Sequence, residues 1–283
     1  MNIALIPNYD KVEAITCSLE IADILISQGA CVFMTEKARD YISHRAITIL
    51  RTDNELFAQC DCAVTVGGDG TIIHSARHAA VSGKPIIGVN LGHLGYVAEL
   101  EPSEISQLKR LLTGNYDTKE RMILDVSVIH EDGSSESYLA INDAVISRGA
   151  LSCIIDLDVS VEGESICSYR ADGLLFSTPT GSTAYALSAG GPVIDPCMRL
   201  IELTPVCPHS LTARTVIFPE DTVLSVRCKS HDTAYLTVDG QVSVELQRSD
   251  LVRVSRSEHT LLMNIMKDKN FYKIAGEKLK EGD

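Results

Sequence analysis

The chain has 283 residues, of which 45% are hydrophobic and 22% charged, a composition typical of a globular protein long enough for two domains. Its formal net charge of −13 argues against nucleic acid or an anionic membrane as partner, and no apolar stretch approaches the roughly 18 residues of a membrane helix. Nine scattered cysteines and an N-terminus without signal-peptide features predict a cytoplasmic protein with reduced thiols, rather than a disulfide framework or a zinc site.

The first part of the chain alternates between strand and helix patterns. An apolar strand is predicted over 3–7, and a helical period of apolar residues over 11–28 ends at Gly29. The later patterns predict strands over 30–34, 61–66 and 84–90, helices over 72–81 and 103–112, and a loop over 39–54. This alternation predicts a parallel sheet covered by helices, in which ligands bind beyond the carboxyl ends of the strands.

One of these strands ends in the turn Gly67-Gly68-Asp69-Gly70-Thr71, just before a helix. Glycines let the backbone approach an anion, and a helix N-terminus presents free N–H groups to it. The turn is not a Walker A loop, because no Gly-Lys-Ser/Thr follows. Asp69 repels phosphate unless a metal or a hydroxyl lies between them. The turn therefore predicts an acid that handles a hydroxyl or a metal beside a phosphate.

The pattern changes to short alternating runs over residues 122–254, with hairpin turns at Asp132-Gly133, Glu162-Gly163 and Asp239-Gly240. These runs predict an antiparallel β region. One stretch, 172–192, interrupts it: a strand enters the turn Pro-Thr-Gly-Ser-Thr, which opens a short helix. Ser182 or Thr183 is expected to cap that helix, whose end suits a diphosphate or a ribose. The tail, about 261–279, predicts a strand or turn followed by a helix.

Taken in order, these motifs resemble those of the NAD kinase family. The box at 67–71, the loop from Asn90 to Tyr96, the pair Asn142-Asp143 and the run 172–192 follow the family's order, and the resemblance extends from residue 3 to about 273. The glycine box alone also occurs in diacylglycerol-type lipid kinases and phosphofructokinases, whereas the long run is more specific. The resemblance implies phosphoryl transfer from ATP, or polyphosphate in some members, to the 2′-hydroxyl of the adenosine ribose of NAD, giving NADP.

The resemblance also implies the architecture. We expect a Rossmann-like α/β domain formed by 1–118 with 261–283, which carries the glycine box. A β-rich, sandwich-like domain, 119–260, is expected to bind the dinucleotide and to mediate self-association as a homodimer or homotetramer. The site is expected between the domains, with Mg²⁺ or another divalent metal accompanying ATP and no metal ligand assigned to a protein side chain.

The family's catalytic aspartate matches Asp69, whose expected role is to orient the 2′-hydroxyl and to accept its proton. The donor phosphates are expected at Gly68, Gly70, Thr71 and His74. His74 is equally open to being an ordinary histidine on the helix surface. His74 and His78 form an i, i+4 pair, but no third metal ligand is suggested.

In the family, the pair at Asn142-Asp143 holds the adenine and ribose of NAD and is usually Asn-Glu. The Asp143 side chain is one methylene shorter than glutamate, so it reaches less far toward the ribose hydroxyls, from which its carboxylate can still accept. The other expected NAD contacts are Asp69, Gly70, Tyr96, Arg170, Asp172, Thr183, Ala184, Tyr185, Ser188 and Gln241. A surface ion pair is the alternative for Arg170 and Asp172, packing for the tyrosines and Ser188, and a hairpin-turn role for Gln241.

Two other functions remain open from the sequence. A related kinase acting on a lipid or a sugar would use the same glycine box, but it would give the run 172–192 no role. A non-catalytic NAD-sensing protein would keep the fold, but it would not need Asp69.

Overall fold

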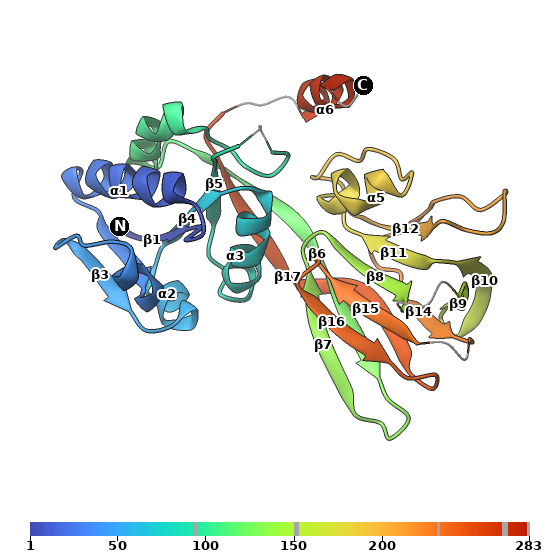
Figure 1. Cartoon of the computed structure of the whole chain (residues 1–283). Coiled ribbons are helices and arrows are strands. Elements are labelled where there is room, and N and C mark those ends of the chain that lie inside the picture. Colours follow the sequence, from blue (N-terminus) through green and yellow to red (C-terminus); the bar gives the residue numbers. More distant parts are fainter. Residues whose placement is uncertain (93–94, 150–152, 231–232, 268–270, 282–283) are drawn as a thin grey trace. The chain divides into compact units, whose positions relative to one another are not determined.

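The computed structural model describes residues 1–92, 95–149, 153–230, 233–267 and 271–281 (Figure 1). The chain divides into two compact units, Met1–Glu120 with His259–Asp283, and Arg121–Glu258. Each unit contains its own hydrophobic cluster. The predicted fold class, an α/β part and a β-rich part, is confirmed. No described helix combines the length and the hydropathy needed to cross a membrane.

The first unit is built on a parallel sheet in the strand order β5-β4-β1-β2-β3, and the end of β17 pairs with β5. Its strands are β1 (Asn2–Pro7), β2 (Cys31–Thr35), β3 (Ile47–Leu50), β4 (Cys62–Gly67), β5 (Ile86–Asn90) and β17 (Leu251–Ile265). Its helices are α1 (Val12–Ser27), η1 (Glu36–Asp40), α2 (Asp53–Gln59), α3 (Asp69–Val81), η2 (Pro102–Lys109), α4 (Arg110–Thr113) and α6 (Phe271–Glu281). Figure 1 shows α1 on one face of the sheet and α2 with α3 on the other.

The register of β4 and β5 positions the glycine turn. Val66 lies opposite Val89, and Gly67 lies opposite Asn90. The N–H of Leu91 donates to the carbonyl of Gly67 at 3.0 Å, which extends the pairing beyond the strand ends. Both glycine-bearing turns therefore start side by side at the carboxyl edge of the sheet, where the sequence predicted ligand binding.

The loop predicted over 39–54 is wrong, because this segment contains the end of η1, the whole of β3 and the start of α2. β3 is a four-residue strand that forms by pairing with β2, and so short a run shows little alternation. Thr52 caps α2: its hydroxyl accepts the N–H of Glu55 at 3.2 Å, while the Glu55 carboxylate accepts the N–H of Arg51. The Thr-x-x-Glu spacing is a helix-start signal that the loop prediction overlooked.

Two helix starts also differ from the prediction. α3 begins at Asp69 rather than Ile72, so the acid lies in the first turn of the helix instead of in the loop. The segment predicted to begin at Ser103 starts as the 3-10 helix η2, with Glu101 as its N-cap. Glu101 and Glu104 form a reciprocal capping box, which a search limited to Ser, Thr, Asp and Asn caps misses.

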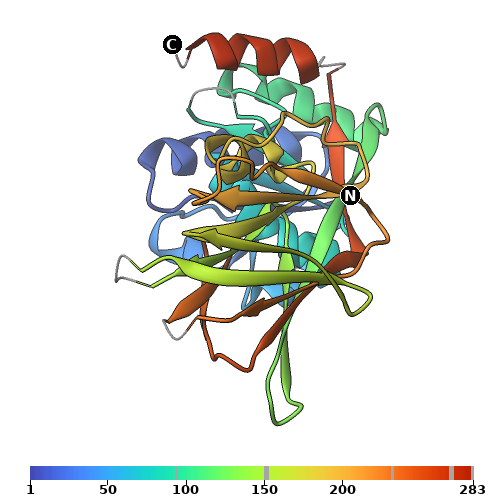
Figure 2. The same ribbon diagram turned by 90° about the vertical axis from the view of Figure 1, so that its right-hand side faces the viewer.

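The second unit contains two antiparallel sheets. One has the order β13-β12-β11-β8-β15-β16, and the other contains β10-β9-β14-β17 with β6 and β7. The strands are β6 (Asp117–Ile129), β7 (Ser135–Ala140), β8 (Asp143–Arg148), β9 (Ile155–Val161), β10 (Glu164–Ala171), β11 (Gly173–Ser177), β12 (Leu200–Val206), β13 (Val216–Pro219), β14 (Leu224–Cys228), β15 (Ala234–Val238) and β16 (Val242–Leu246). Figure 2 shows the β6–β7 hairpin, in green, extending past the other strands of this unit.

Alternation along β8 separates the core of the second unit from the opposite face of the six-stranded sheet. Ala144 and Ile146 belong to the large hydrophobic cluster that joins the two sheets. Val145 lies on the other face, packed with Leu175 and with Ala186 of α5 (Tyr185–Ser188). That face, covered in part by η3 (Gly181–Thr183) and α5, carries a cavity.

Candidate active site

Asp69 is the first residue of α3, directly after β4 and the extended residue Gly68. The N–H groups of Thr71 and Ile72 donate to the carbonyl of Gly68, at 3.0 and 3.3 Å. The N–H groups of Asp69 and Gly70 precede this bonded turn and lie at the open end of the helix. This arrangement is the one that binds phosphate at a helix N-terminus.

One oxygen of the Asp69 carboxylate accepts a hydrogen bond, and the other has no partner among the described residues. Oδ2 accepts the N–H of Tyr96 at 3.0 Å, whereas Oδ1 is buried and has no hydrogen-bond partner within the described part of the chain. Gly95 leaves space for this carboxylate, since a Cβ there would lie 1.9 Å from Oδ1. A buried acceptor without a partner is rare unless a ligand supplies the donor, so Oδ1 fits either a hydroxyl or a hard cation.

The histidines of α3 differ in their surroundings. His74 is exposed, and its ring meets that of His78 edge-on at 6.4 Å between centroids. His78 in turn stacks on Phe57 of α2 at 5.9 Å. Among the described residues, no group of three histidine, cysteine or acidic side chains could hold a metal ion. The expected contact of His74 with phosphate stays a prediction.

The ring of Tyr96 lies beneath the ammonium group of Lys278, which is 4.3 Å from the ring centroid. Lys278 belongs to α6, so the C-terminal helix contacts the loop whose backbone holds Asp69. The expected contact of Tyr96 with adenine is untested. Its observed role is that of a backbone donor to the carboxylate.

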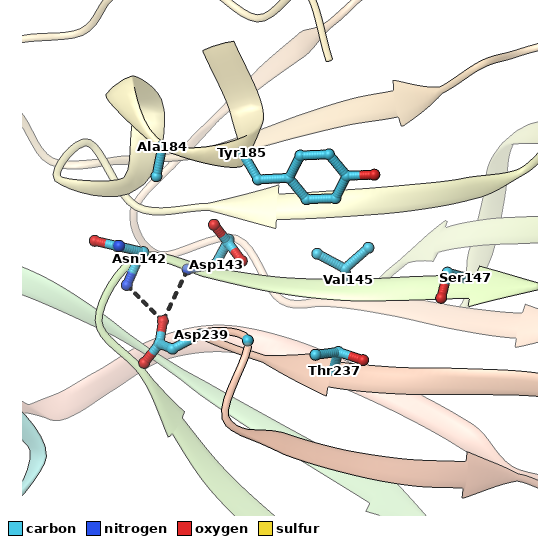
Figure 3. A pocket seen from close by; sticks show the side chains of 9 residues that line it. Asn142, Asp143, Val145, Ser147, Ala184, Tyr185, Thr237 and Asp239 are labelled. Carbon is cyan, nitrogen blue, oxygen red and sulfur yellow. Dashed lines mark hydrogen bonds between the residues drawn. The ribbon is translucent and has the colours of Figure 1, made fainter. Parts of the chain in front are cut away.

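The second unit contains a cavity of about 420 Å³ on the outer face of its six-stranded sheet (Figure 3). Four of the residues expected to bind NAD line it: Asn142, Asp143, Ala184 and Tyr185. The other lining residues are Val145, Ser147, Thr237, Asp239 and Gly240. The cavity therefore gathers three segments that lie far apart in the sequence.

The run 172–192 reaches the cavity through backbone contacts with the residues just before β8. The N–H of Thr178 donates to the carbonyl of Asn142 at 2.9 Å, and the Thr178 hydroxyl donates to the carbonyl of Ile141 at 2.7 Å. A Cβ at Gly181 would lie 2.1 Å from the Asn142 carbonyl oxygen, so only glycine allows this approach. These contacts position Ala184 and Tyr185 near Asn142.

Asp143 is buried, with only 6% of its surface exposed. Burial, and then the negative charge of Asp239, raise its pKa from 3.8 to about 7. Its carboxyl group is thus protonated in part of the molecules near neutral pH and can either donate or accept a hydrogen bond. Asn142 Oδ1 is also buried, without a partner in the described chain.

The expected capping role of Ser182 is wrong. Its side chain is fully buried, donating to the carbonyl of Pro179 at 2.8 Å and accepting the N–H of Ile194 at 3.1 Å. Thr183 forms no cap either, and its hydroxyl lies 3.5 Å from the carbonyl of Thr180. Ser182 holds the turn together from inside, because its hydroxyl is short enough to satisfy two backbone groups at once.

Five further residues expected at the NAD site do not line this cavity. Arg170 pairs with Asp156 of β9 at 3.4 Å on an exposed surface, and Asp172 pairs with Arg148 at 2.7 Å. Thr183 is half-buried, whereas Ser188 and Gln241 are exposed. The structure therefore places Arg170 and Asp172 in two different ion pairs, and their contact with NAD stays a prediction.

Sequence reasoning missed five lining residues, and strand alternation could have found three of them. Val145 and Ser147 follow Asp143 at two-residue steps along β8, and Thr237 lies opposite Val145 on β15. Asp239 and Gly240 were noted only as a hairpin turn. No local signal connects that turn with residues almost 100 positions earlier.

Two family models match the chain: the ATP-NAD kinase N-terminal domain over residues 3–116 and the ATP-NAD kinase C-terminal domain over residues 141–264. The chain belongs to the NAD kinase family. An NAD kinase of Trichlorobacter lovleyi is 41% identical over 235 residues, covering 82% of each chain, and one of Citrifermentans bemidjiense is 34% identical over 284 residues, covering 99% of each. These matches confirm the predicted enzyme class and do not favour a lipid kinase, a sugar kinase or a sensor.

Solved structures of the NAD kinase family show the same fold. Yeast NADH kinase in complex with NADH matches with a TM-score of 0.88 at 25% identity, covering 99% of this chain and 87% of its own. An NAD kinase from Archaeoglobus fulgidus in complex with ATP matches with a TM-score of 0.75 at 23% identity, covering 99% of both chains.

Proposed function

We propose that this NAD kinase family member phosphorylates the 2′-hydroxyl of the adenosine ribose of NAD with ATP, giving NADP, and that Asp69 is its catalytic base. The observation that carries the assignment is the Asp69 carboxylate, in which Oδ2 is held by the Tyr96 N–H and Oδ1 is buried without a partner among the described residues. An alcohol is a poor nucleophile at neutral pH, and Oδ1 offers an oriented acceptor for its proton.

The donor phosphates are assigned to the start of α3, with Gly68, Gly70 and Thr71 at the open helix end and His74 in the following turn. The N–H groups of Asp69 and Gly70 bind anionic oxygens there, and the helix dipole favours negative charge. In phosphoryl transfer, alignment and charge neutralisation provide most of the catalysis. The base at position 69 adds to that effect.

The dinucleotide is assigned to the cavity of the second unit. The side chains of Asn142 and Asp143 provide buried polar groups for the adenosine or a ribose, and Ala184 and Tyr185 provide apolar contact. Additional contacts are assigned, as a proposal, to Asp69, Gly70, Tyr96, Arg170, Asp172, Thr183, Ser188 and Gln241. The yeast relative was solved with NADH and the Archaeoglobus fulgidus relative with ATP, which supports binding of both substrate classes.

A divalent metal, Mg²⁺ in the simplest case, is expected to accompany ATP. Among the described residues, no group of three histidine, cysteine or acidic side chains could hold the ion alone, so the phosphate oxygens of ATP, which suit a hard cation, would carry it. When bound, the metal supplies charge neutralisation of the phosphates. The donor in this proposal is ATP, and polyphosphate remains a substrate to be tested beside it.

We further propose that the two functional domains are 1–118 with 261–283 and 119–260, that the protein forms a homodimer or homotetramer, and that it works in the cytoplasm. All nine cysteines are free thiols, which supports a reducing compartment. Light scattering after gel filtration measures the assembly directly.

The activity is tested with purified protein, NAD, ATP and Mg²⁺, coupled to an NADP-specific dehydrogenase. Asp69→Asn is expected to lower kcat by about 10²- to 10⁴-fold, the range for a lost general base, while NAD binding measured by calorimetry survives. Asp53→Asn is the matched control, because Asp53 is likewise the first residue of a helix in the same unit. Full turnover by Asp69→Asn would remove the catalytic assignment.

A further inference from the structure

Asp239 lies in the turn between β15 and β16 in an unusual backbone conformation. Its φ is +49°, and Gly240 follows at +65°, so both turn residues are left-handed. The N–H of Gln241 donates to the carbonyl of Val238 at 3.0 Å, so Asp239 and Gly240 are the central residues of a β-turn. Glycine and asparagine adopt positive φ in such a turn more easily than aspartate. A non-glycine residue in this region costs on the order of 1 kcal/mol and is retained where surrounding interactions hold it.

The side chain of Asp239 binds the backbone of residues 141–143, at the start of β8. The Asp239 carboxylate accepts the N–H of Ile141 at 3.0 Å, of Asn142 at 2.8 Å and of Asp143 at 3.1 Å. Figure 3 shows the last two of these bonds. In return, the N–H of Asp239 donates to the carbonyl of Asp143 at 2.9 Å. Bonds to an ionised acceptor are the stronger kind, and three successive ones fix a backbone segment.

The same segment is held on its carbonyl side by the run 172–192. Asn142 C=O accepts the Thr178 N–H at 2.9 Å and the Ser177 hydroxyl at 3.2 Å. The backbone from Ile141 to Asp143 is therefore bonded on both sides, while the amide oxygen of the Asn142 side chain has no partner among the described residues. The side chains of Asn142 and Asp143 remain available to the cavity that they line.

We propose that Asp239 is a positioning residue for the dinucleotide: it clamps the backbone of 141–143 so that Asn142 and Asp143 present their side chains to the bound NAD. The inference deepens the proposed function and rests on it. Asp239 acts through the backbone and does not itself take part in phosphoryl transfer.

Asp239 also affects the pKa of Asp143, an effect that a purely structural role in the turn would lack. The titratable groups lining the cavity are Asp143, Asp239 and Tyr185. Burial, and then the negative charge of Asp239, together raise the pKa of Asp143 to about 7. Removing that charge while keeping an acceptor oxygen should lower the pKa of Asp143.

Two substitutions of Asp239 are compatible with the left-handed turn. They therefore test the hydrogen bonds to 141–143 without disrupting the turn itself. Asp239→Gly removes the carboxylate, and Asp239→Asn keeps one acceptor oxygen without the charge. The matched control is Glu162→Gly, which makes an acid-to-glycine change at φ +51°, also before a glycine, in the β9–β10 hairpin of the same unit. Glu162 does not line the cavity.

Asp239→Gly is expected to weaken NAD binding by about 10- to 100-fold, the size of lost charge-assisted hydrogen bonds, with Glu162→Gly unchanged. Hydrogen exchange should accelerate at the amides of 141–143 in Asp239→Gly alone. In Asp239→Asn, NMR titration of the Asp143 carboxyl should give a pKa below that of the unsubstituted protein.

Equal NAD affinity and equal exchange in Asp239→Gly and Glu162→Gly would overturn the proposal, as would an unchanged Asp143 pKa in Asp239→Asn. An unsubstituted protein that forms no NADP would instead overturn the proposed function. Hydrogen exchange still decides in that case whether the clamp exists.

Discussion

Gly95 and Asp69 are so close that a Cβ at position 95 would lie 1.9 Å from Asp69 Oδ1, and a side chain there would displace the carboxylate. The neighbouring Tyr96 holds the other carboxylate oxygen through its N–H. The same loop thus orients the carboxylate through the hydrogen bond from Tyr96 and leaves space for it because Gly95 has no side chain.

Gly95→Ala should therefore reduce turnover much more than stability. The added methyl group displaces the end of a half-buried side chain, which can rotate away, but a shift near 1 Å at a reacting group can cost about 100-fold in rate. Steady-state kinetics and thermal melting measure the two effects. Gly92→Ala is the control, because a Cβ at Gly92 meets nothing within 4 Å. Equal kcat in both variants would contradict the assigned role of Gly95.

Asp143 makes stability depend on pH. Its pKa is about 7 in the folded protein against an ordinary 3.8, so the folded state binds more protons between these values and loses stability as pH rises. One pKa unit corresponds to ~1.4 kcal/mol, so the loss between about pH 5 and pH 8 is on the order of 2–3 kcal/mol. Urea denaturation at several pH values measures it.

Asp143→Asn, which cannot ionise, should remove that part of the pH dependence. A curve as steep as that of the unsubstituted protein would show that Asp143 is not its source. Asp143→Glu lengthens the acid by one methylene group, and its effect on the KM for NAD tests whether the shorter side chain limits reach.

Gly181→Ala should impair folding and NAD binding together. Its Cβ would lie 2.1 Å from the carbonyl oxygen of Asn142, a backbone atom that cannot rotate away. Overpacking of this kind costs roughly 1–3 kcal/mol, and the displaced atom belongs to the cavity wall. Melting temperature and calorimetric NAD affinity should both fall. In Gly276→Ala, an open position on α6, neither should fall.

Chelation should abolish turnover but not NAD binding. No metal-binding group of three histidine, cysteine or acidic side chains occurs in the described part of the chain, so the ion is expected to arrive with the nucleotide phosphates. EDTA should stop NADP formation, and excess Mg²⁺ should restore it. Calorimetry with NAD should give the same affinity with and without EDTA. Turnover that persists under chelation would contradict the expected metal.

Local patterns predicted the elements whose residues interact with near neighbours. The apolar run into Gly67 identified β4, and the pairs Asp132-Gly133, Glu162-Gly163 and Asp239-Gly240 identified three hairpins, because turn chemistry acts over a few residues. β3 was missed because it forms by pairing with β2 rather than by its own pattern.

Site residues that belong to a sequence motif could be predicted. Site residues whose role depends on contacts with distant parts of the sequence could not. Asp69, Asn142 and Asp143 were found from their motifs. The approach of Gly95 to Asp69 spans 26 positions, and the bonds of Asp239 span 96 to 98, so neither leaves a local signal. Both depend on the tertiary pairing of strands and loops.

The alternation of β8 and β15 has a consequence for how acceptor preference could evolve. Substitutions at Val145, Ser147 or Thr237 remodel the cavity wall, whereas their neighbours Ile146 and Leu236 fill the interior. Because Val145 is itself buried against Leu175 and Ala186, a mutational library confined to the half-buried positions Ser147 and Thr237 can alter the cavity wall with the least penalty to folding.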